Sequence, residues 1–213
     1  MIKRHEDYDA YLKQMGRYMR MAIKYEVAAV QEDIADAMKC DWPDQLYLWD
    51  EVSQAKKDVE PASLLVFGSS YNLPNVRALA LYLLSQLDGG MCYVKYACVG
   101  ENGARWHLLT SNDFHDLLRV IELQRSAWLV TRRPCTDCGN TDNETTKRQQ
   151  VKREVLEKRD CLATLHRYIT DTQNSKYCSK CWSDRIKDAE RAKKDFWSEL
   201  QQIGKGQGHL VCY

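Results

Sequence analysis

The sequence predicts an α+β fold in three parts. Residues 1–62 form a helical N-terminal region, residues 63–132 a small α+β core with a mixed sheet, and residues 133–213 a mainly helical C-terminal region. Three observations support this division. Apolar residues recur at helical spacing in the first part, short apolar runs flank turn signals in the second, and long charged stretches with helical spacing follow Arg133.

The composition is that of a folded protein rather than a disordered or membrane-spanning one. Apolar residues make up 44% of the 213 residues, which is enough to bury a core in one or two domains. No run of 18 apolar residues occurs, so we expect no membrane-spanning helix, and the charged N-terminus lacks the apolar segment of a secretory signal. We therefore expect an intracellular protein, located in the cytoplasm or with the chromosomal DNA in a nucleoid or nucleus.

Residues 6–39 have the pattern of one or two amphipathic helices. Their apolar side chains recur three or four residues apart, at Tyr8, Leu12, Met15, Met19, Ala22, Ile23, Val27, Val30, Ile34 and Met38. Pro43 interrupts the pattern, and Asp44 can begin a further helix that includes Trp49. This stripe predicts core packing, and a cofactor-binding or partner-binding surface is the alternative interpretation.

Short apolar runs in the middle of the chain predict the strands of the mixed sheet. The run "SLLVFG" at residues 63–68 ends in glycine, as buried strands often do. The runs "MCYVKYACV" and "RWHLLT" flank Asn102-Gly103, which is a strong signal for a β-hairpin turn. Residues 127–131, "AWLVT", predict one more strand.

Two amphipathic helices complete the predicted middle region. One begins at Pro74, has leucines along one face and stops before Gly89-Gly90. The other follows Ser111 or Asn112, either of which can cap its first turn. Sheet and helices would then share one core.

Two Cys-x-x-Cys pairs lie in the C-terminal region: Cys135 and Cys138 in "RRPCTDCGNTD", and Cys178 and Cys181 in "SKYCSKCWSDR". The first has the form of a zinc knuckle, because Gly139 permits the tight turn that brings both thiolates onto one ion. The second precedes a helical pattern, and the positive end of a helix dipole stabilises thiolates. The sequence therefore predicts a four-cysteine Zn²⁺ site. Four thiolates leave zinc no open position for water, so we expect a structural metal.

The 39 residues between the two pairs exceed the usual zinc-ribbon separation of about 15 to 20. The arrangement is similar to a treble clef, a zinc-finger fold, with a helical insertion between its two halves. Separate redox dithiols are the main alternative, but neither pair lies in a recognisable thioredoxin-like βαβ pattern.

One stretch, "AWLVTRRPCTDC", resembles the strand and Pro-Cys-x-x-Cys segment of the zinc-dependent cytidine deaminases, over residues 91–138. That family requires His-x-Glu or Cys-x-Glu at the start of the preceding helix, for the third zinc ligand and the proton shuttle. The candidates here, His107 and His115, are not followed by that glutamate. Without the carboxylate the chemistry lacks its general acid and base, so the sequence argues against a deaminase.

Two cysteine pairs around His166 also resemble the layout of a His-Asn-His nuclease. In that family the histidine lies on a hairpin strand, whereas "ATLHRYI" has a helical pattern. A zinc-stapled nuclease is therefore only a third hypothesis. No carboxylate pair, nucleophile triad or cofactor loop stands out, which favours a non-enzymatic protein without a small-molecule substrate.

The net charge of +1 hides an uneven distribution. Residues 1–62 carry 9 basic and 13 acidic side chains, and residues 131–213 carry 17 and 12. Basic residues are predicted on the polar faces of the C-terminal helices, at Lys147, Arg148, Lys152, Arg153, Arg185 and Lys187. Such helices can contact phosphates, so the sequence favours a zinc-containing regulatory protein that binds DNA or RNA.

The alternative is a protein-interaction module with a structural zinc, such as an adaptor or an inhibitor of a larger machine. Its charge-mixed amphipathic helices and acidic N-terminal segment are typical of interaction surfaces, and Trp42 and Trp49 are of the type that anchors them. The purely structural interpretation of both tryptophans is that they lie in the core.

Overall fold

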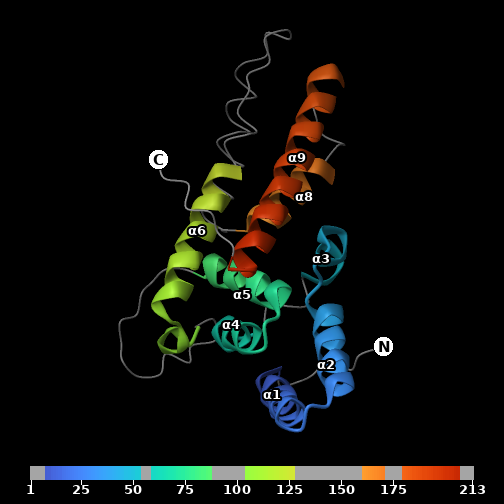
Figure 1. Cartoon of the computed structure of the whole chain (residues 1–213). Coiled ribbons are helices and arrows are strands. Elements are labelled where there is room, and N and C mark those ends of the chain that lie inside the picture. Colours follow the sequence, from blue (N-terminus) through green and yellow to red (C-terminus); the bar gives the residue numbers. More distant parts are fainter. Residues whose placement is uncertain (1–7, 54–58, 88–103, 128–159, 171–178, 207–213) are drawn as a thin grey trace. The chain divides into compact units, whose positions relative to one another are not determined.

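The computed structural model describes residues 8–53, 59–87, 104–127, 160–170 and 179–206 (Figure 1). Every regular element in these ranges is a helix. The elements in chain order are α1 (Tyr8–Lys24), α2 (Ala28–Asp41), α3 (Leu46–Val52), α4 (Pro61–Ser70), α5 (Pro74–Gln86), the 3₁₀ helix η2 (Trp106–Leu108), α6 (Ser111–Ala127), α8 (Cys161–Thr170) and α9 (Ser179–Gly204). None of these helices is both long enough and apolar enough to cross a membrane.

The chain divides into two compact units. The first comprises Met1–Leu117 together with Leu200–Tyr213, and the second comprises Leu118–Glu199. Of the two boundaries expected from the sequence, the one at residues 132–133 lies outside the described residues and the one at residues 62–63 falls within α4; the three-part division stays a prediction.

The predicted mixed sheet is wrong, because the part of the chain that the structure describes contains no strand. Residues 63–68 lie within α4, residues 106–108 form η2, and Ala127 ends α6. The remaining predicted strand residues, 91–99 and 128–131, lie outside the described ranges, as does most of the predicted hairpin turn.

The start of α4 explains why residues 63–68 are helical. The Glu60 carboxylate accepts hydrogen bonds from the backbone N–H groups of Ala62 and Ser63, at 3.1 and 2.7 Å, and Pro61 occupies the first turn. Proline is pre-organised for this position and the carboxylate satisfies donors that have no partner within the helix. A short apolar run fits a buried helix as well as a buried strand, so the Glu60 cap and Pro61 favour the helix here.

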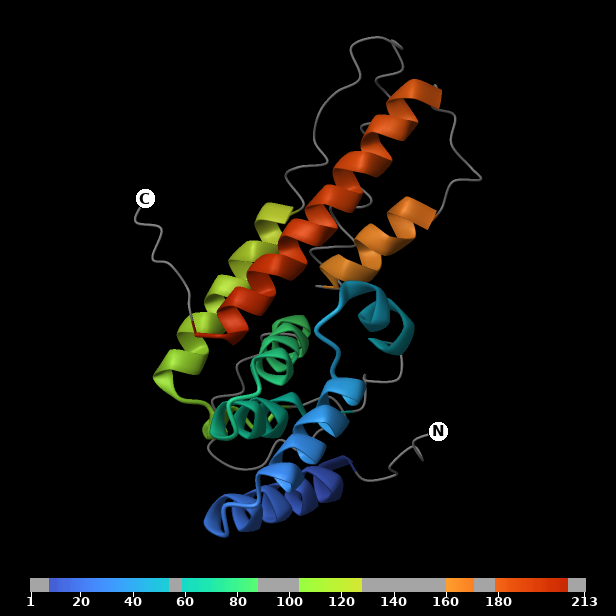
Figure 2. The ribbon, with the colours of Figure 1, turned by 45° about the vertical axis from the view of Figure 1, so that its right-hand side comes forward.

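Helices α4 and α5 form the central hairpin of the first unit and lie side by side in both views (Figures 1 and 2). The turn between them uses Asn72 in the left-handed region, with φ 53°. The helices approach closely at Gly68, where a Cβ atom would lie 2.8 Å from the backbone nitrogen of Arg77. The prediction of a helix that begins at Pro74 is confirmed.

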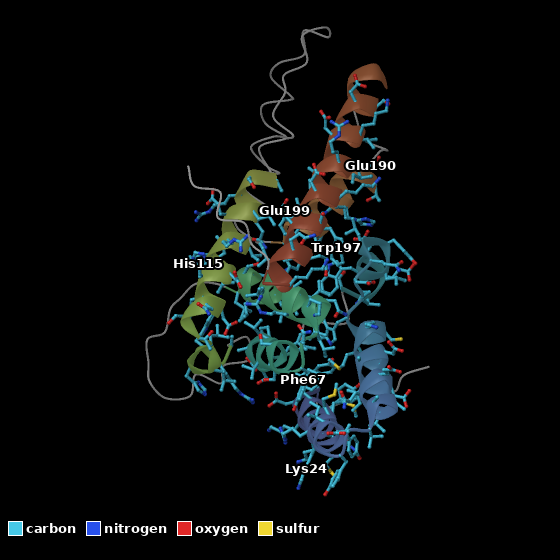
Figure 3. All side chains as sticks on the ribbon, viewed as in Figure 1. Lys24, Phe67, His115, Glu190, Trp197 and Glu199 are labelled. Atoms are coloured by element: carbon cyan, nitrogen blue, oxygen red, sulfur yellow. The ribbon has the colours of Figure 1, made fainter. Side chains whose placement is uncertain are left out.

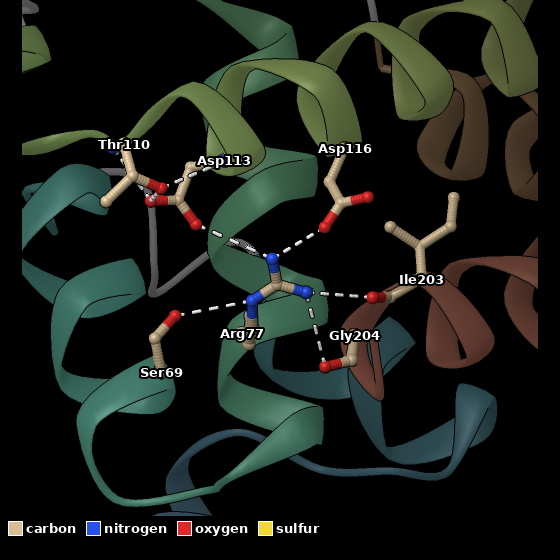
Figure 4. Close-up of polar contacts among 7 residues, drawn as sticks. All are labelled: Ser69, Arg77, Thr110, Asp113, Asp116, Ile203 and Gly204. Carbon is tan, nitrogen blue, oxygen red and sulfur yellow. Dashed lines mark hydrogen bonds and ion pairs between the residues drawn. The ribbon is translucent and has the colours of Figure 1, made fainter. Parts of the chain in front are cut away.

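Arg77 is the one charged residue of α5, and it joins three segments of the first unit (Figure 4). Its guanidinium donates to Asp116 Oδ2 at 2.6 Å, lies 3.5 Å from Asp113 Oδ1, and donates to the backbone carbonyl of Ile203 at 2.9 Å. The arginine thereby offsets two carboxylates from the start of α6 and satisfies a carbonyl at the end of α9.

The cap of α6 is Thr110, one residue before the two candidates expected from the sequence. The backbone N–H of Asp113 donates to Thr110 Oγ1 at 3.2 Å, and Asp113 Oδ2 accepts from the Thr110 backbone N–H at 2.9 Å. This reciprocal pair is a capping box, with aspartate in the place usually taken by glutamate or glutamine.

Both N-terminal tryptophans belong to the core of the first unit. Trp42 is fully buried, donates from Nε1 to the Tyr8 hydroxyl, and accepts from Asn75 Nδ2 at its backbone carbonyl. Trp49 is also buried and packs edge-on against Tyr82, with ring centroids 6.2 Å apart. Neither is an exposed anchor for a partner, so the core interpretation holds for both.

In the second unit, α8 packs against α9. Leu162 and Leu165 are buried on α8, and Ala189 and Phe196 are buried on α9. Lys193 Nζ lies 3.2 Å from His166 Nδ1, which places the two helices in direct contact. His166 is helical, as its sequence pattern predicted.

Candidate functional site

The hairpin of α1 and α2 is folded by a three-residue turn at residues 25–27. Glu26 takes the left-handed conformation, with φ 55°, and the Val27 backbone N–H donates to the carbonyl of Ala22 at 2.8 Å. Gln31 Nε2 donates to the same carbonyl at 3.2 Å and fastens α2 to the end of α1. The turn therefore brings the two helices together along their sides.

One face of this hairpin packs on the rest of the first unit. Leu12 and Met19 of α1 and Ile34 and Met38 of α2 are buried, with Met38 fully so. At Gly16 the backbone carbonyl of α1 accepts a hydrogen bond from the Tyr71 hydroxyl at 2.9 Å, beside the buried ring of Phe67 (Figure 3). Part of the predicted stripe is therefore core, as expected.

Beside this packed face, the hairpin has a solvent-open apolar groove of about 460 Å³. We call it the α1–α2 groove, and its lining residues are Met15, Tyr18, Met21, Ala22, Tyr25, Val27, Val30, Asp33, Ile34 and Ala37. Met21 is 57% exposed and Tyr25 is 64% exposed. The prediction that the whole stripe packs in the core is wrong for Ile23, Val27 and Val30, which are also exposed.

The two flanks of the groove carry opposite charges. Helix α1 has four basic residues and one acidic residue, whereas α2 has four acidic residues and one basic residue. Arg17 and Lys24 lie four residues before and three residues after Met21, on the same side of α1. On α2, Asp33 lines the groove and Asp36 follows one turn later.

Local contacts support these flanking side chains. Lys24 Nζ lies 5.4 Å from the centroid of the Tyr25 ring, a cation–π distance, at the end of α1 (Figure 3). Asp36 Oδ1 accepts from Lys39 Nζ at 2.9 Å, and this hydrogen bond raises the pKa of the Lys39 ammonium. Both interactions are exposed, so they orient the side chains more than they stabilise the fold.

The chemistry of the groove is that of binding rather than catalysis. Its lining is apolar and aromatic apart from one carboxylate, so it offers no acid–base pair or nucleophile with a supporting base. Methionine adapts its shape to irregular apolar partners, and tyrosine is enriched in protein interfaces. The groove can therefore bury apolar side chains of another polypeptide at about 25 cal/mol for each Å² removed from water.

The sequence contained a signal for this groove. On α1, Leu12 and Met19 are seven residues apart and form the buried stripe. Tyr18, Met21 and Tyr25 repeat with spacings of three and four residues and form a second stripe on a different face. A helix with two apolar stripes has more apolar surface than a single packing contact covers.

Three of the four predicted zinc ligands, Cys135, Cys138 and Cys178, lie outside the described residues. Helix α9 begins at Ser179, so Cys181 is in its first turn, at the helix start that the sequence predicted. Among the residues that the structure describes, no group of three or more His, Cys, Asp or Glu side chains is arranged to hold a metal. Burial raises the pKa of the Cys161 thiol to about 12, which makes this cysteine a poor metal ligand.

Some of the residues predicted to contact nucleic acid also lie outside the described residues. Lys147, Arg148, Lys152 and Arg153 lie outside the described residues, whereas Arg185 and Lys187 are on α9 and Lys187 is exposed. The exposed charges of the described part of α9 are of both signs: Asp184, Lys187, Glu190, Arg191, Lys194, Asp195 and Glu199 (Figure 3). This part of α9 is therefore not a uniformly basic stripe.

Comparisons of the chain with protein-family models, with curated proteins and with solved structures found no match.

Proposed function

We propose that this protein is a protein-interaction module that binds another polypeptide in the α1–α2 groove. The observation that carries the proposal is the contiguous row of exposed apolar side chains along that groove, which includes Tyr18, Met21, Tyr25, Val27 and Val30. Large contiguous apolar patches are uncommon on the surfaces of monomeric proteins, and those that occur usually mark interaction sites.

The shape of the groove favours a helical ligand. Two packed helices leave a furrow between them, and an amphipathic helix can lay its apolar face into such a furrow. The opposite charges of the two flanks would orient the bound segment, because its own charged edges must match them. A ligand of this kind uses apolar burial for affinity and the flanking charges for register.

Paired charge substitutions in full-length protein test this proposal. Met21→Lys and Val30→Lys place ammonium groups in the groove, whereas Leu118→Lys makes the same change at a site of unit two that is 65% exposed. Each tagged protein is purified from its native cells and the co-purifying polypeptides are quantified. We expect a stoichiometric polypeptide to fall at least about tenfold with the groove variants and to persist with Leu118→Lys. Equal recovery with all proteins would overturn the proposal.

We infer that the module also contains a structural Zn²⁺ bound by Cys135, Cys138, Cys178 and Cys181, and that it works inside the cell. The spacing of the two pairs and the position of Cys181 in the first turn of α9 support the metal. Reducing compartments keep such cysteines available as thiolates. Elemental analysis should find one zinc per chain, lost in Cys181→Ser and retained in the control Cys40→Ser, whose cysteine is exposed on α2.

Nucleic acid is the second candidate ligand, and the uneven charge of the sequence favours it. Residues 131–213 carry 17 basic and 12 acidic side chains, although the described face of α9 is mixed. If this zinc-containing region is a regulatory nucleic-acid-binding element, affinity for random DNA or RNA should fall steeply as salt rises, because phosphate contacts release counterions. Absence of binding at low salt would remove this candidate.

A further inference from the structure

We propose that the occupant of the α1–α2 groove is a second copy of this chain. Two hairpins would pack about a two-fold axis, with α1 of each copy against α2 of the other, to form a four-helix arrangement. The inference rests on the proposed function, since it names the partner of the same surface. It follows from the charges and dimensions of the two helices.

The charge pattern of the hairpin is complementary to itself. A two-fold interface brings the same patch of both copies together, so the patch must match its own rotated image. Helix α1 is basic on its exposed side through Arg17 and Lys24, and α2 is acidic through Asp33 and Asp36. Rotation by 180° can place each basic flank against an acidic flank, so the two ionic seams close at the same time.

The same charges select one of the two possible pairings. If α1 met its own copy, Arg17 and Lys24 would face the same residues of the other chain, and the α2 carboxylates would likewise face each other. Like charges placed together across an interface oppose association. The charges therefore favour the crossed pairing, α1 on α2, over the pairing of α1 with α1. The residues to exchange in an experiment are the basic residues of α1 and the acidic residues of α2.

The dimensions of the hairpin suit such a dimer. The 17 residues of α1 and the 14 residues of α2 give helices about 25 Å and about 21 Å long, so each can cover the other along its length. Two helices of this length bury on the order of 1,000 Å² in total, at the low end of specific interfaces. We therefore expect a reversible dimer with a dissociation constant in the micromolar range.

Charge exchange between the two helices tests the dimer. Variant one carries Arg17→Glu and Lys24→Glu, which makes both flanks acidic at the groove. Variant two carries Asp33→Lys and Asp36→Lys, which makes both flanks basic. All four positions are exposed, so both proteins should keep the helicity of the wild type and, at a dilution where every protein is a single chain, a similar melting temperature. Sedimentation equilibrium of full-length protein is measured from about 1 to about 200 µM, a range that brackets a micromolar dissociation constant.

Wild-type protein should change from the mass of one chain to the mass of two across this range. Each variant alone should associate at least about tenfold more weakly, because like charges meet at both seams. An equimolar mixture of the two variants should regain the two-chain mass, since each supplies the charges that the other lacks. Recovery in the mixture cannot come from a general loss of folding. The weakening of each variant alone selects the crossed pairing, because α1 packed on α1 would already bring like charges together in the wild type.

Three results would overturn the dimer: a wild-type chain that stays single at every concentration, variants that associate as well as the wild type, or a mixture that fails to pair. A single wild-type chain whose different, stoichiometric partner is lost with Met21→Lys would leave the proposed function standing without the dimer. If no polypeptide binding depends on Met21, both proposals fall.

Discussion

The first unit contains two helical hairpins that are built alike and buried differently. Both have short turns with one non-glycine residue in the left-handed region, Glu26 between α1 and α2 and Asn72 between α4 and α5. The α4–α5 hairpin has a single charged residue, Arg77, and its large side chains are almost all buried. The α1–α2 hairpin has ten charged residues in its two helices and Glu26 in its turn, and part of its apolar surface stays open as a groove.

This difference shows what separates a core hairpin from a binding hairpin. A helix with one charged residue or none must be covered on nearly every side, so α4 and α5 form the centre on which other elements pack. Helices with both charges and two apolar stripes can bury one stripe and remain soluble on the other face. The surplus stripe of α1 and α2 then stays open to a partner, which the charges on its flanks would select.

The largest expected effect compares a leucine of the core hairpin with a methionine of the groove. Leu81→Ala should lower the free energy of unfolding by about 3 to 4 kcal/mol, because Leu81 is fully buried and its truncation leaves a cavity. Met21→Ala should change it by less than about 0.5 kcal/mol, because that side chain is 57% exposed. Chemical denaturation of dilute protein, where the groove is open, measures both; similar losses would break the comparison.

The charged residue of the core hairpin gives the next effect. Arg77→Leu should cost about 3 kcal/mol, because it leaves Asp113 and Asp116 in a largely buried place without their cation. The exposed pair of Arg125 with Glu122, at 3.7 Å, supplies the control. Arg125→Leu should cost less than about 0.5 kcal/mol, since exposed pairs contribute little. Thermal melting measures both variants. Equal falls in melting temperature would show that the buried contacts of Arg77 stabilise the fold no more than an exposed ion pair does.

These comparisons also show how far the sequence could lead. The helix at Pro74 was predictable because proline, helical spacing and leucines all agree. The helix at Pro61 was missed because "SLLVFG" has no period of its own, and the cap at Glu60 lies before the run. A binding surface on the N-terminal stripe was only the alternative interpretation, because periodicity finds apolar faces without saying which of them another helix covers. For Met21 that depends on the packing of the whole unit, which no local pattern contains.

A smaller effect concerns how closely each hairpin packs at a glycine. Gly68→Ala should cost about 2 kcal/mol, because its Cβ would lie 2.8 Å from the backbone nitrogen of Arg77 and the two core helices would have to separate. In α1, Gly16→Ala meets the Tyr71 hydroxyl at 3.4 Å, an ordinary contact. Alanine is also the better helix former, so this variant should be neutral or stabilising by up to about 1 kcal/mol. Urea midpoints of the pair give the comparison, and a loss at Gly16 as large as that at Gly68 would contradict it.

The smallest effect concerns Thr110, which caps α6 and positions Asp113 next to Arg77. Thr110→Ala should cost about 1 kcal/mol, because it removes the hydroxyl that accepts from the Asp113 backbone N–H and donates to Asp113 Oδ2 at 2.7 Å. Ser111→Ala is the matched control: it removes a hydroxyl from the neighbouring exposed residue, which lies inside the first turn rather than at the cap, and should shift the unfolding free energy by only a few tenths of a kcal/mol. Because Asp113 also faces Arg77, loss of the cap should make the Thr110→Ala and Arg77→Leu effects less than additive in the double variant. If the two losses of unfolding free energy simply add in the double variant, the Thr110 cap stabilises α6 alone and does not support the contact of Asp113 with Arg77.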